Sequence, residues 1–379
     1  MKKTIAILLA FAFCFLCVTA CKSSAKPRGK STNGGGSSPA AAEPFPVFGT
    51  PVPEKRSLTL AEFDELLVSL PLTVEETHYV VQDETYKSLY PDLLQVILLN
   101  RTDADIRSAV VAFAAWDEND LPVKIKGDLD YSGGDYVKKV RYSDINMIPG
   151  SLYGKNGGYE IDESCGIARF RAVVVSFETF EGDTWENPYF DEWQTLFDCK
   201  KFSDAMTVEV TVEDAAFHGS GRDLSVDAAA ERELAALIDA QAFRVVETNY
   251  IVQDEQYKSL YPDLLQAVVY NGTELDIKDA VVAFAAWDEN GLPVRIKGSM
   301  SFSDPSYVRK VNYSGINMIP GASYGKNGGY ELDSSCKIAS FKAIVVSYTA
   351  FDGTEWDNPL FEQWCAMYEG VKLRISDRP

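Results

Sequence analysis

The spacing of apolar residues changes from helical to alternating several times along this chain, and each change marks an expected element. Residues 59–70 carry an apolar side chain every three or four positions, which is the period of an amphipathic helix. Thr59, with Glu62 three positions later, has the form of a capping box. A second helix is predicted over 225–241, where an alanine-rich composition adds helix propensity.

A further helix is predicted to close each half of the chain. Asn187 can cap the first of these helices, and Pro188 suits its first turn. The apolar faces expected to be buried are formed by Phe190, Trp193 and Phe197 in the first helix, and by Phe361, Trp364 and Tyr368 in the second.

Between the helices, the pattern is that of short strands separated by turns. Residues 109–116 are apolar on both faces, so we expect a partner sheet to cover one face and a helix the other. Asn290-Gly291 is a strong hairpin signal, and we expect Asn119-Asp120 to form a similar turn. Further strands are predicted at 77–82, 93–99, 122–126, 136–142 and 167–180, and residues 206–212 are expected to pair with the edge of the first sandwich. Short strands with turns between them indicate a β-sandwich.

The stretch YKSLYPDLLQ occurs twice, at Tyr86–Gln95 and at Tyr257–Gln266. The offset of 171 residues holds without a gap between 76–198 and 247–369. A period this long, repeated once, indicates a duplicated domain. We therefore predict a mainly β protein with two tandem sandwich domains and flanking helices. The expected boundaries are 57–202 for the first repeat, 203–224 for a connecting strand or linker, and 225–379 for the second repeat.

Residues 1–20 have the form of a signal peptide. Lys2 and Lys3 precede an apolar run over 5–16 that is too short to span a bilayer. The sequence that ends at Cys21, Val-Thr-Ala-Cys, resembles the lipobox of bacterial lipoproteins, which implies cleavage before Cys21 and lipidation of its sulfur. The alternative is an ordinary secretory signal that happens to contain a cysteine.

Residues 21–56 are predicted to form a flexible tether, because Gly, Ser, Pro and Ala dominate and no apolar period is present. Residues 1–56 carry eight Lys or Arg and two Asp or Glu, so the total formal charge of −20 leaves −26 on the rest of the chain. An anionic membrane attracts such a stem and repels such a body. We expect a lipid-anchored, extracytoplasmic protein of a cell membrane or outer membrane. An acidic body argues against a nucleic-acid partner.

Several motifs together resemble a known family. YKSLYPDLLQ, AVVAFAAWDENGLPV, INMIPG and YGKNGGYELD, followed by a Trp-Glu-Asn-Pro or Trp-Asp-Asn-Pro segment, look like DUF5780, a bacterial domain of unknown function, over nearly all of both repeats. The Asn-Arg-Thr or Asn-Gly-Thr turn and the strand after it are also similar to FxLYD, a family of small immunoglobulin-like domains. The resemblance implies immunoglobulin-like sandwiches and brings no catalytic motif.

The ionisable residues contain no catalytic or metal-binding motif. The two histidines are His78 and His218, and Asn249 takes the place of His78 in the second repeat, so no His-based triad or zinc site is shared. We predict no enzymatic activity, no cofactor and no metal. Carboxylates present in both repeats, such as Glu160 and Glu331, leave a carboxylate-dependent hydrolase as an alternative.

Aromatic and polar residues in the loops are the candidates for ligand binding, because an exposed ring can stack on a sugar or anchor a protein contact. The alternative is that the rings close the ends of the sandwich. The YGKNGGYE loop and its neighbours provide the candidates Tyr153, Lys155, Asn156, Tyr159 and Trp185, and in the second repeat Tyr324, Lys326, Asn327, Tyr330 and Trp356.

Each repeat also holds two cysteines. In an oxidising compartment Cys165 could pair with Cys199, and Cys336 with Cys365, whereas free buried thiols are the alternative. These observations favour a non-enzymatic lipoprotein that binds a protein or an envelope glycan. A spacer without a ligand of its own remains open.

Overall fold

The computed structural model describes residues 55–83, 90–128, 130, 132–212, 215–254, 256, 260–299 and 304–374. The expected signal, Cys21, most of the expected tether and the first part of each YKSLYPDLLQ stretch lie outside these residues. Residues 53–379 belong to one compact unit. Among the described residues, no helix is long and apolar enough to cross a membrane.

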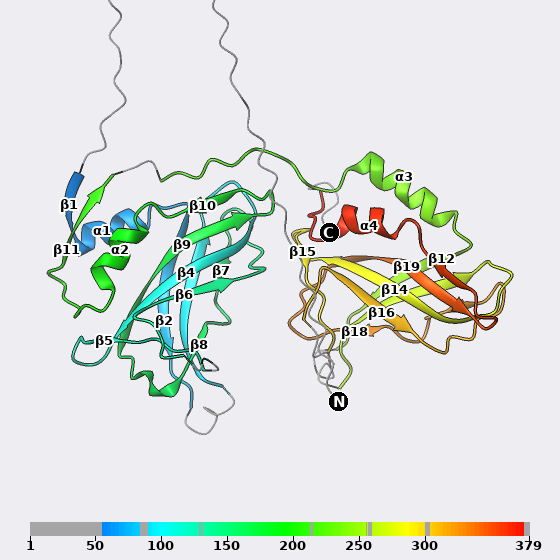
Figure 1. The fold of residues 1–379 in the computed structure, drawn as a ribbon, viewed down its shortest axis with the longest axis horizontal. Coiled ribbons are helices and arrows are strands. Elements are labelled where there is room, and N and C mark those ends of the chain that lie inside the picture. The colour runs from blue at the N-terminus through cyan, green and yellow to red at the C-terminus, as the bar shows by residue number, and fades with distance from the viewer. Residues whose placement is uncertain are drawn as a thin grey trace, which may run out of the picture. The chain divides into compact units, whose positions relative to one another are not determined.

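Each repeat contains two antiparallel sheets, of four and five strands (Figure 1). The first repeat forms one sheet from β2 (Leu72–Val80), β3 (Asp92–Asn100), β7 (Leu152–Tyr153) and β8 (Tyr159–Ile161). Its other sheet consists of β4 (Ile106–Trp116), β5 (Pro122–Val123), β6 (Val137–Tyr142), β9 (Arg169–Thr179) and β10 (Thr184–Glu186). The 3-10 helix η1 (Glu163–Cys165) connects the two sheets.

The second repeat has the same strand order. Its four-stranded sheet contains β12 (Phe243–Ile251), β13 (Leu264–Asn271), β17 (Ser323–Tyr324) and β18 (Tyr330–Glu331). Its five-stranded sheet contains β14 (Ile277–Trp287), β15 (Pro293–Val294), β16 (Val308–Tyr313), β19 (Ser340–Ala350) and β20 (Glu355–Asp357). The sequence prediction of a mainly β, sandwich-like architecture is thus confirmed.

The central strand of each five-stranded sheet is covered on both faces, as its apolar sequence predicts. In β14, Val282, Phe284 and Ala286 belong to the core between the sheets. The alternate residues Ala283, Ala285 and Trp287 belong to a second core, which is closed by helices α3 (Ala228–Asp239) and α4 (Phe361–Tyr368). The two-residue alternation of a strand therefore distributes one apolar run between two separate cores.

The helices begin close to the expected positions, with one correction. Helix α1 (Leu60–Leu67) starts with the expected capping box, in which the Thr59 hydroxyl accepts from the Glu62 amide and the Glu62 carboxylate accepts from the Thr59 amide. Helix α2 (Phe190–Phe197) has Tyr189 at its N-cap, not Asn187. Asn187 is buried, and its amide donates to the carbonyl of Val174 at 2.7 Å. It therefore joins the preceding turn to β9.

The hairpin after β4 confirms the prediction for Asn119-Asp120. Asp120 adopts a φ of 63°, and Gly291 adopts 70° at the equivalent position. The first repeat thus places a side chain in a left-handed conformation that favours glycine.

The expected pairing of residues 206–212 is wrong. Strand β11 (Thr207–Thr211) pairs antiparallel with β1 (Lys55–Thr59) in a separate two-stranded sheet. Lys55 and Arg56, expected to end the tether, are part of this strand. The pairing follows from Leu58 and Val208, which share a register position and pack against the core of the first repeat.

Candidate functional site

The YGKNGG loop of each repeat passes very close to the central strand of the four-stranded sheet. Strands β7 and β8 both pair with β3, so the loop between them bridges the same strand. Gly154 has a φ of +105°, and a Cβ at this position would lie 2.0 Å from the carbonyl oxygen of Val96. Gly325 has a φ of +109° and would place a Cβ 2.4 Å from the carbonyl oxygen of Ala267. Only glycine allows this close approach.

A glutamine in the strand beneath holds each loop. The Gln95 amide nitrogen donates to the carbonyls of Gly154 and Lys155, both at 3.0 Å, and to that of Gly157 at 3.2 Å. Gln266 donates in the same way to Lys326 at 2.9 Å and to Gly328 at 3.1 Å. The backbone of the loop is therefore fixed, while the candidate side chains at its tip are exposed: Lys155, Asn156, Lys326 and Asn327.

The tyrosines beside these loops mainly close the sandwich. Tyr159 stacks on Phe113 with ring centroids 6.3 Å apart, and Tyr330 stacks on Phe284 at 6.5 Å. The Tyr330 hydroxyl also accepts a hydrogen bond from Arg309 Nε at 2.7 Å. These contacts match the alternative in which the rings cap the end of the fold.

Tyr153 and Tyr324 differ in exposure. Tyr153 packs edge-on against Tyr142, and burial raises its pKa. Tyr324 packs against Tyr313 in the same way but remains 41% exposed. Of the four candidate tyrosines, Tyr324 thus offers the most accessible ring.

Trp185 is not an exposed ring, contrary to the prediction. It is 7% exposed and stacks on Phe177 at 5.3 Å. Its indole nitrogen donates to the carbonyl of Ala215 at 3.0 Å. The connecting segment that contains Ala215 covers the ring, and no local sequence pattern indicated that contact. Trp356 is half-buried against Tyr348.

The four described cysteines are free thiols, so the two disulfides considered from the sequence are not formed. Cys165 Sγ lies 3.6 Å from the carbonyl oxygen of Lys126, whereas Cys199 is exposed and hydrogen-bonds with Tyr136. Cys336 contacts the amide of Lys297, and Cys365 lies on α4. The two cysteines considered for each disulfide therefore lie in different surroundings.

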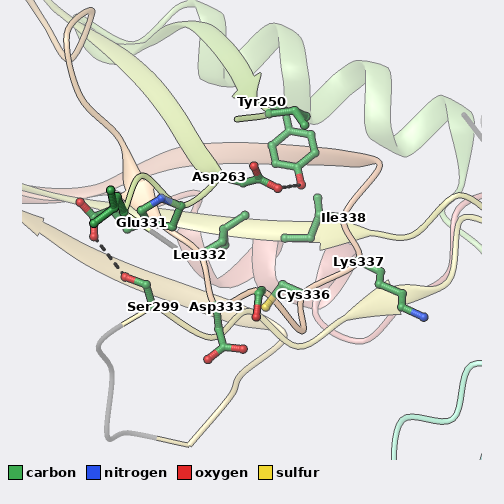
Figure 2. Close-up of a pocket in the computed structure, with 13 residues that line it drawn as sticks. Tyr250, Asp263, Ser299, Glu331, Leu332, Asp333, Cys336, Lys337 and Ile338 are labelled. Carbon is green, nitrogen blue, oxygen red and sulfur yellow. Dashed lines mark hydrogen bonds between the residues drawn. The ribbon is translucent and has the colours of Figure 1, made fainter. Parts of the chain in front are cut away.

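A pocket of about 880 Å³ lies at one end of the second sandwich (Figure 2). Two segments distant in sequence form most of it, namely the YPD end of the duplicated stretch and the segment that follows the YGKNGG loop. Its lining residues are Tyr250, Val252, Leu260, Pro262, Asp263, Ser299, Glu331, Leu332, Asp333, Ser334, Cys336, Lys337 and Ile338.

Asp263 fixes one wall of this pocket. Its carboxylate accepts a hydrogen bond from the backbone amide of Gln253 at 2.8 Å and one from the Tyr250 hydroxyl at 3.3 Å. Figure 2 shows the ring of Tyr250 directed toward this carboxylate. Asp92 accepts equivalent bonds from Gln82 and Tyr79 in the first repeat. The carboxylate at this position therefore holds the end of β12, or of β2, against the YPD turn.

Asp333 supplies negative charge at the opposite wall. Hydrogen bonds from Ser335 and the nearby ammonium group of Lys297, 3.2 Å away, lower the Asp333 pKa to about 2. Glu331 accepts a hydrogen bond from Ser299 at 3.1 Å. Burial raises the pKa of the Cys336 thiol, which opposes formation of a nucleophilic thiolate. The side chain of Lys337 extends away from these carboxylates (Figure 2).

Two stretches of the chain, residues 93–200 and 264–371, match one family model, described as a family of unknown function, DUF5780. Together they cover more than half of the 379 residues. The chain belongs to the DUF5780 family. Its two matches stand in tandem, and each begins directly after the aspartate of the YPD turn.

Comparison with solved structures adds little to the DUF5780 assignment. A hypothetical protein from Peptoclostridium difficile 630 is 14% identical over 36% of this chain and 96% of that chain, with a TM-score of 0.29. Allantoicase from Saccharomyces cerevisiae is 14% identical over 77% of this chain and 96% of that chain, with a TM-score of 0.11. TM-scores this low do not support a common fold. No curated protein matches the chain.

Both DUF5780 repeats expose apolar side chains at the end that carries the YPD turn. Val252, Leu260 and Tyr261 are 61%, 73% and 62% exposed in the second repeat. Val81 and Tyr90, their equivalents in the first repeat, are 60% and 61% exposed. Sequence reasoning missed this surface, although identical apolar residues within a polar stretch were a signal for it.

The carboxylates shared by the DUF5780 repeats have mainly structural contacts. Asp117 accepts from the amides of Asn119 and Leu121, and Asp288 accepts from those of Asn290 and Leu292. These bonds hold the hairpin turn. In the part of the chain described by the structure, no group of three or more His, Cys, Asp or Glu side chains could hold a metal ion.

Proposed function

We propose that this protein is a lipid-anchored lipoprotein of the cell envelope whose DUF5780 repeats bind a polypeptide ligand without catalysing a reaction. The lipobox-like sequence that ends at Cys21 supports the anchor, and the basic composition of residues 21–56 supports a stem beside an anionic membrane. Two packed antiparallel sheets of four and five strands support an immunoglobulin-like fold for each repeat.

The observation that carries the binding proposal is the juxtaposition of exposed apolar and ionised groups at the YPD end of the second repeat. Val252 and Leu260 form an accessible apolar rim, and Asp333 remains ionised at neutral pH. An exposed apolar patch rimmed by polar groups marks an interaction site more often than a solvated surface. A polypeptide segment with a Lys or Arg flanked by apolar side chains complements both features.

A glycan fits this pocket less well than a polypeptide does. Sugar binding relies on open aromatic faces, but Tyr159 and Tyr330 stack on core rings and Trp185 is buried. The Tyr250 ring lines the pocket, yet its hydroxyl is occupied by Asp263. Accessible side chains at the pocket are therefore mainly aliphatic or charged.

The two repeats are expected to prefer ligands of different charge. Three pocket positions become more negative in the first repeat: Ser299, Ser334 and Lys337 are replaced by Asp128, Glu163 and Gly166. The first repeat should therefore favour the more basic polypeptide.

Binding of fluorescent peptides to the chain from residue 22 onward tests the proposal. The probes are nine-residue peptides with a central Arg between Leu, Val and Phe, together with matched peptides in which Glu replaces Arg. We expect preference for the Arg peptides, weakened about tenfold by the double substitution Val252→Asp and Leu260→Asp in the second repeat. Val246→Asp, at an exposed valine of β12 outside the pocket, is the control.

Equal affinity for Arg and Glu peptides, or equal loss in the control variant, would rule out the proposed ligand chemistry. Failure of all peptides to bind, combined with capture on an oligosaccharide array, would favour a glycan ligand instead. Failure of both would favour a spacer.

A further inference from the structure

A buried ion cluster joins the two repeats. Lys372, which follows α4 of the second repeat, places its ammonium group 3.2 Å from the Asp105 carboxylate of the first repeat, and it also pairs with Glu181. Only 9% of either carboxylate side chain and 14% of the Lys372 side chain is exposed. Burial lowers the pKa of Lys372, but the two carboxylates outweigh it and raise that pKa. The cluster therefore stays charged and depends on both repeats.

A second group of contacts lies at the same junction. Asp144 of the first repeat accepts from the Tyr307 hydroxyl at 2.5 Å and pairs with Arg295 Nε at 3.1 Å. The Asn146 amide donates to the carbonyl of Pro293 at 3.2 Å. We define the acidic face by Asp105, Asp144, Asn146 and Glu181 of the first repeat, and the basic face by Pro293, Arg295, Tyr307 and Lys372 of the second.

Because the chain is duplicated, each face has a counterpart on the other repeat. The 171-residue offset relates the basic face to Pro122, Lys124, Tyr136 and Lys201 of the first repeat. It relates the acidic face to Asp276, Gly315, Asn317 and Asp352 of the second repeat. Gly315 takes the place of Asp144, and it is the one position of the two counterpart faces at which the charged or polar side chain is missing. Lys124 even lies over the Tyr136 ring at 5.5 Å, as Arg295 lies over that of Tyr307 at 5.0 Å.

The charged side chains of these counterpart faces are exposed. Asp276, Asp352 and Lys201 are exposed, whereas Asp105 and Glu181 of the junction are buried.

Apolar residues near the faces show the same contrast. Leu121 is 48% exposed, but its equivalent beside the basic face, Leu292, is fully buried. Ile319 and Phe351 are 64% and 58% exposed beside the second acidic face, and their equivalents Ile148 and Phe180 are half-buried.

We propose that the protein self-associates head to tail, with the basic face of the first repeat in one molecule binding the acidic face of the second repeat in another. The partner is a second copy of this chain, because each exposed face is complementary to the other and the same pairing already joins the repeats within one molecule. Such a contact is heterologous, so it leaves one face of each kind open at the ends and can continue.

The contact between molecules is weaker than the junction within the chain. Residues 203–224 link the repeats covalently and give the internal junction a high effective concentration. Gly315 also lacks the carboxylate with which Asp144 holds Arg295 and Tyr307. Gly315 has a φ of 63° and Asp144 a φ of 55°, so aspartate is compatible with this backbone conformation.

Sedimentation velocity of the chain from residue 22 onward, over a wide concentration range, tests the proposal. We expect the weight-average sedimentation coefficient to rise with concentration beyond that of a dimer. Lys201→Glu or Asp352→Lys should each weaken association at least about tenfold, because like charges then face each other. Gly315→Asp should tighten it about fivefold, the scale of one exposed ion pair. Lys55→Glu, at an exposed lysine of β1, is the control and should change nothing.

Mixing the two charge variants gives a sharper result. The Lys201→Glu protein keeps its acidic face and the Asp352→Lys protein keeps its basic face, and their two altered faces carry opposite charges, so an equimolar mixture should associate more strongly than either variant alone. Monomers at every concentration, including for Gly315→Asp, would overturn the proposal. Association that Lys201→Glu leaves unchanged would also overturn it, as would a mixture that associates no more strongly than either variant alone.

Discussion

Replacing Gly154 with alanine tests whether the YGKNGG loop depends on close backbone approach. The new Cβ would lie 2.0 Å from the Val96 carbonyl oxygen, at a φ of +105°. Ordinary contact begins near 3.4 Å, so the loop must move off β3 by more than an ångström. Movement on this scale disrupts the pairing of Leu98 with Tyr153 and the hydrogen bonds from Gln95.

The expected loss of stability is about 4 kcal/mol. Backbone strain at such a φ costs about 1–3 kcal/mol, and each lost hydrogen bond costs about 1 kcal/mol. This is a large part of the roughly 5–15 kcal/mol that stabilises a typical domain. Gly325→Ala should behave similarly in the second repeat, because its Cβ would lie 2.4 Å from the carbonyl oxygen of Ala267.

Urea denaturation followed by tryptophan fluorescence measures the change in unfolding free energy, and hydrogen exchange of the β3 and β7 amides locates it. Gly157→Ala is the matched control in the same loop, because nothing lies within 4 Å of its Cβ. That variant should stay within about 1 kcal/mol of the wild type. If Gly154→Ala fell within the same range, close approach would not be the reason for glycine.

Three further predictions concern single groups. Thr59→Ala removes the cap of α1 and should cost about 1 kcal/mol of unfolding free energy in urea denaturation, whereas Thr59→Ser should restore most of it. The folded-state pKa of Asp333, about 2, lies below its unfolded value near 4, so its contribution to folding stability is present above about pH 4 and is lost as the pH falls through about 2. The wild type should therefore be more stable than Asp333→Asn at pH 6. A difference in stability that persists undiminished below pH 2 would contradict this. Iodoacetamide labelling followed by mass spectrometry should modify exposed Cys199 faster than Cys165 and Cys336, because burial raises the pKa of the latter two thiols; faster labelling of Cys336 would count against the described burial.

Local sequence pattern predicted most of the elements, because each of them has a local cause. The capping box at Thr59, the turn at Asn119-Asp120 and the apolar strand over 109–116 all depend on residues within a few positions of one another. Side-chain alternation in a strand depends only on the backbone, so the two-sided burial of that strand was also predictable.

The candidate site was predicted only in part. The YGKNGG loop was recognised as a loop that needs its glycines, but Trp185 was expected to be exposed. Its burial depends on Ala215, which is 30 residues away in the sequence and lies in the connecting segment. The pocket at the YPD end was not predicted, since its walls come from segments about 70 residues apart.

The amino-acid sequence by itself determined the internal repeat, the mainly β architecture and the positions of most helices and strands, because periodicity and turn chemistry act over short distances. Tertiary structure alone decided which distant segments meet. Strand β11 pairs with β1, the segment of Ala215 covers Trp185, and Lys372 lies between Asp105 and Glu181. These contacts join residues that are far apart in the chain, so the local sequence around each residue does not predict them.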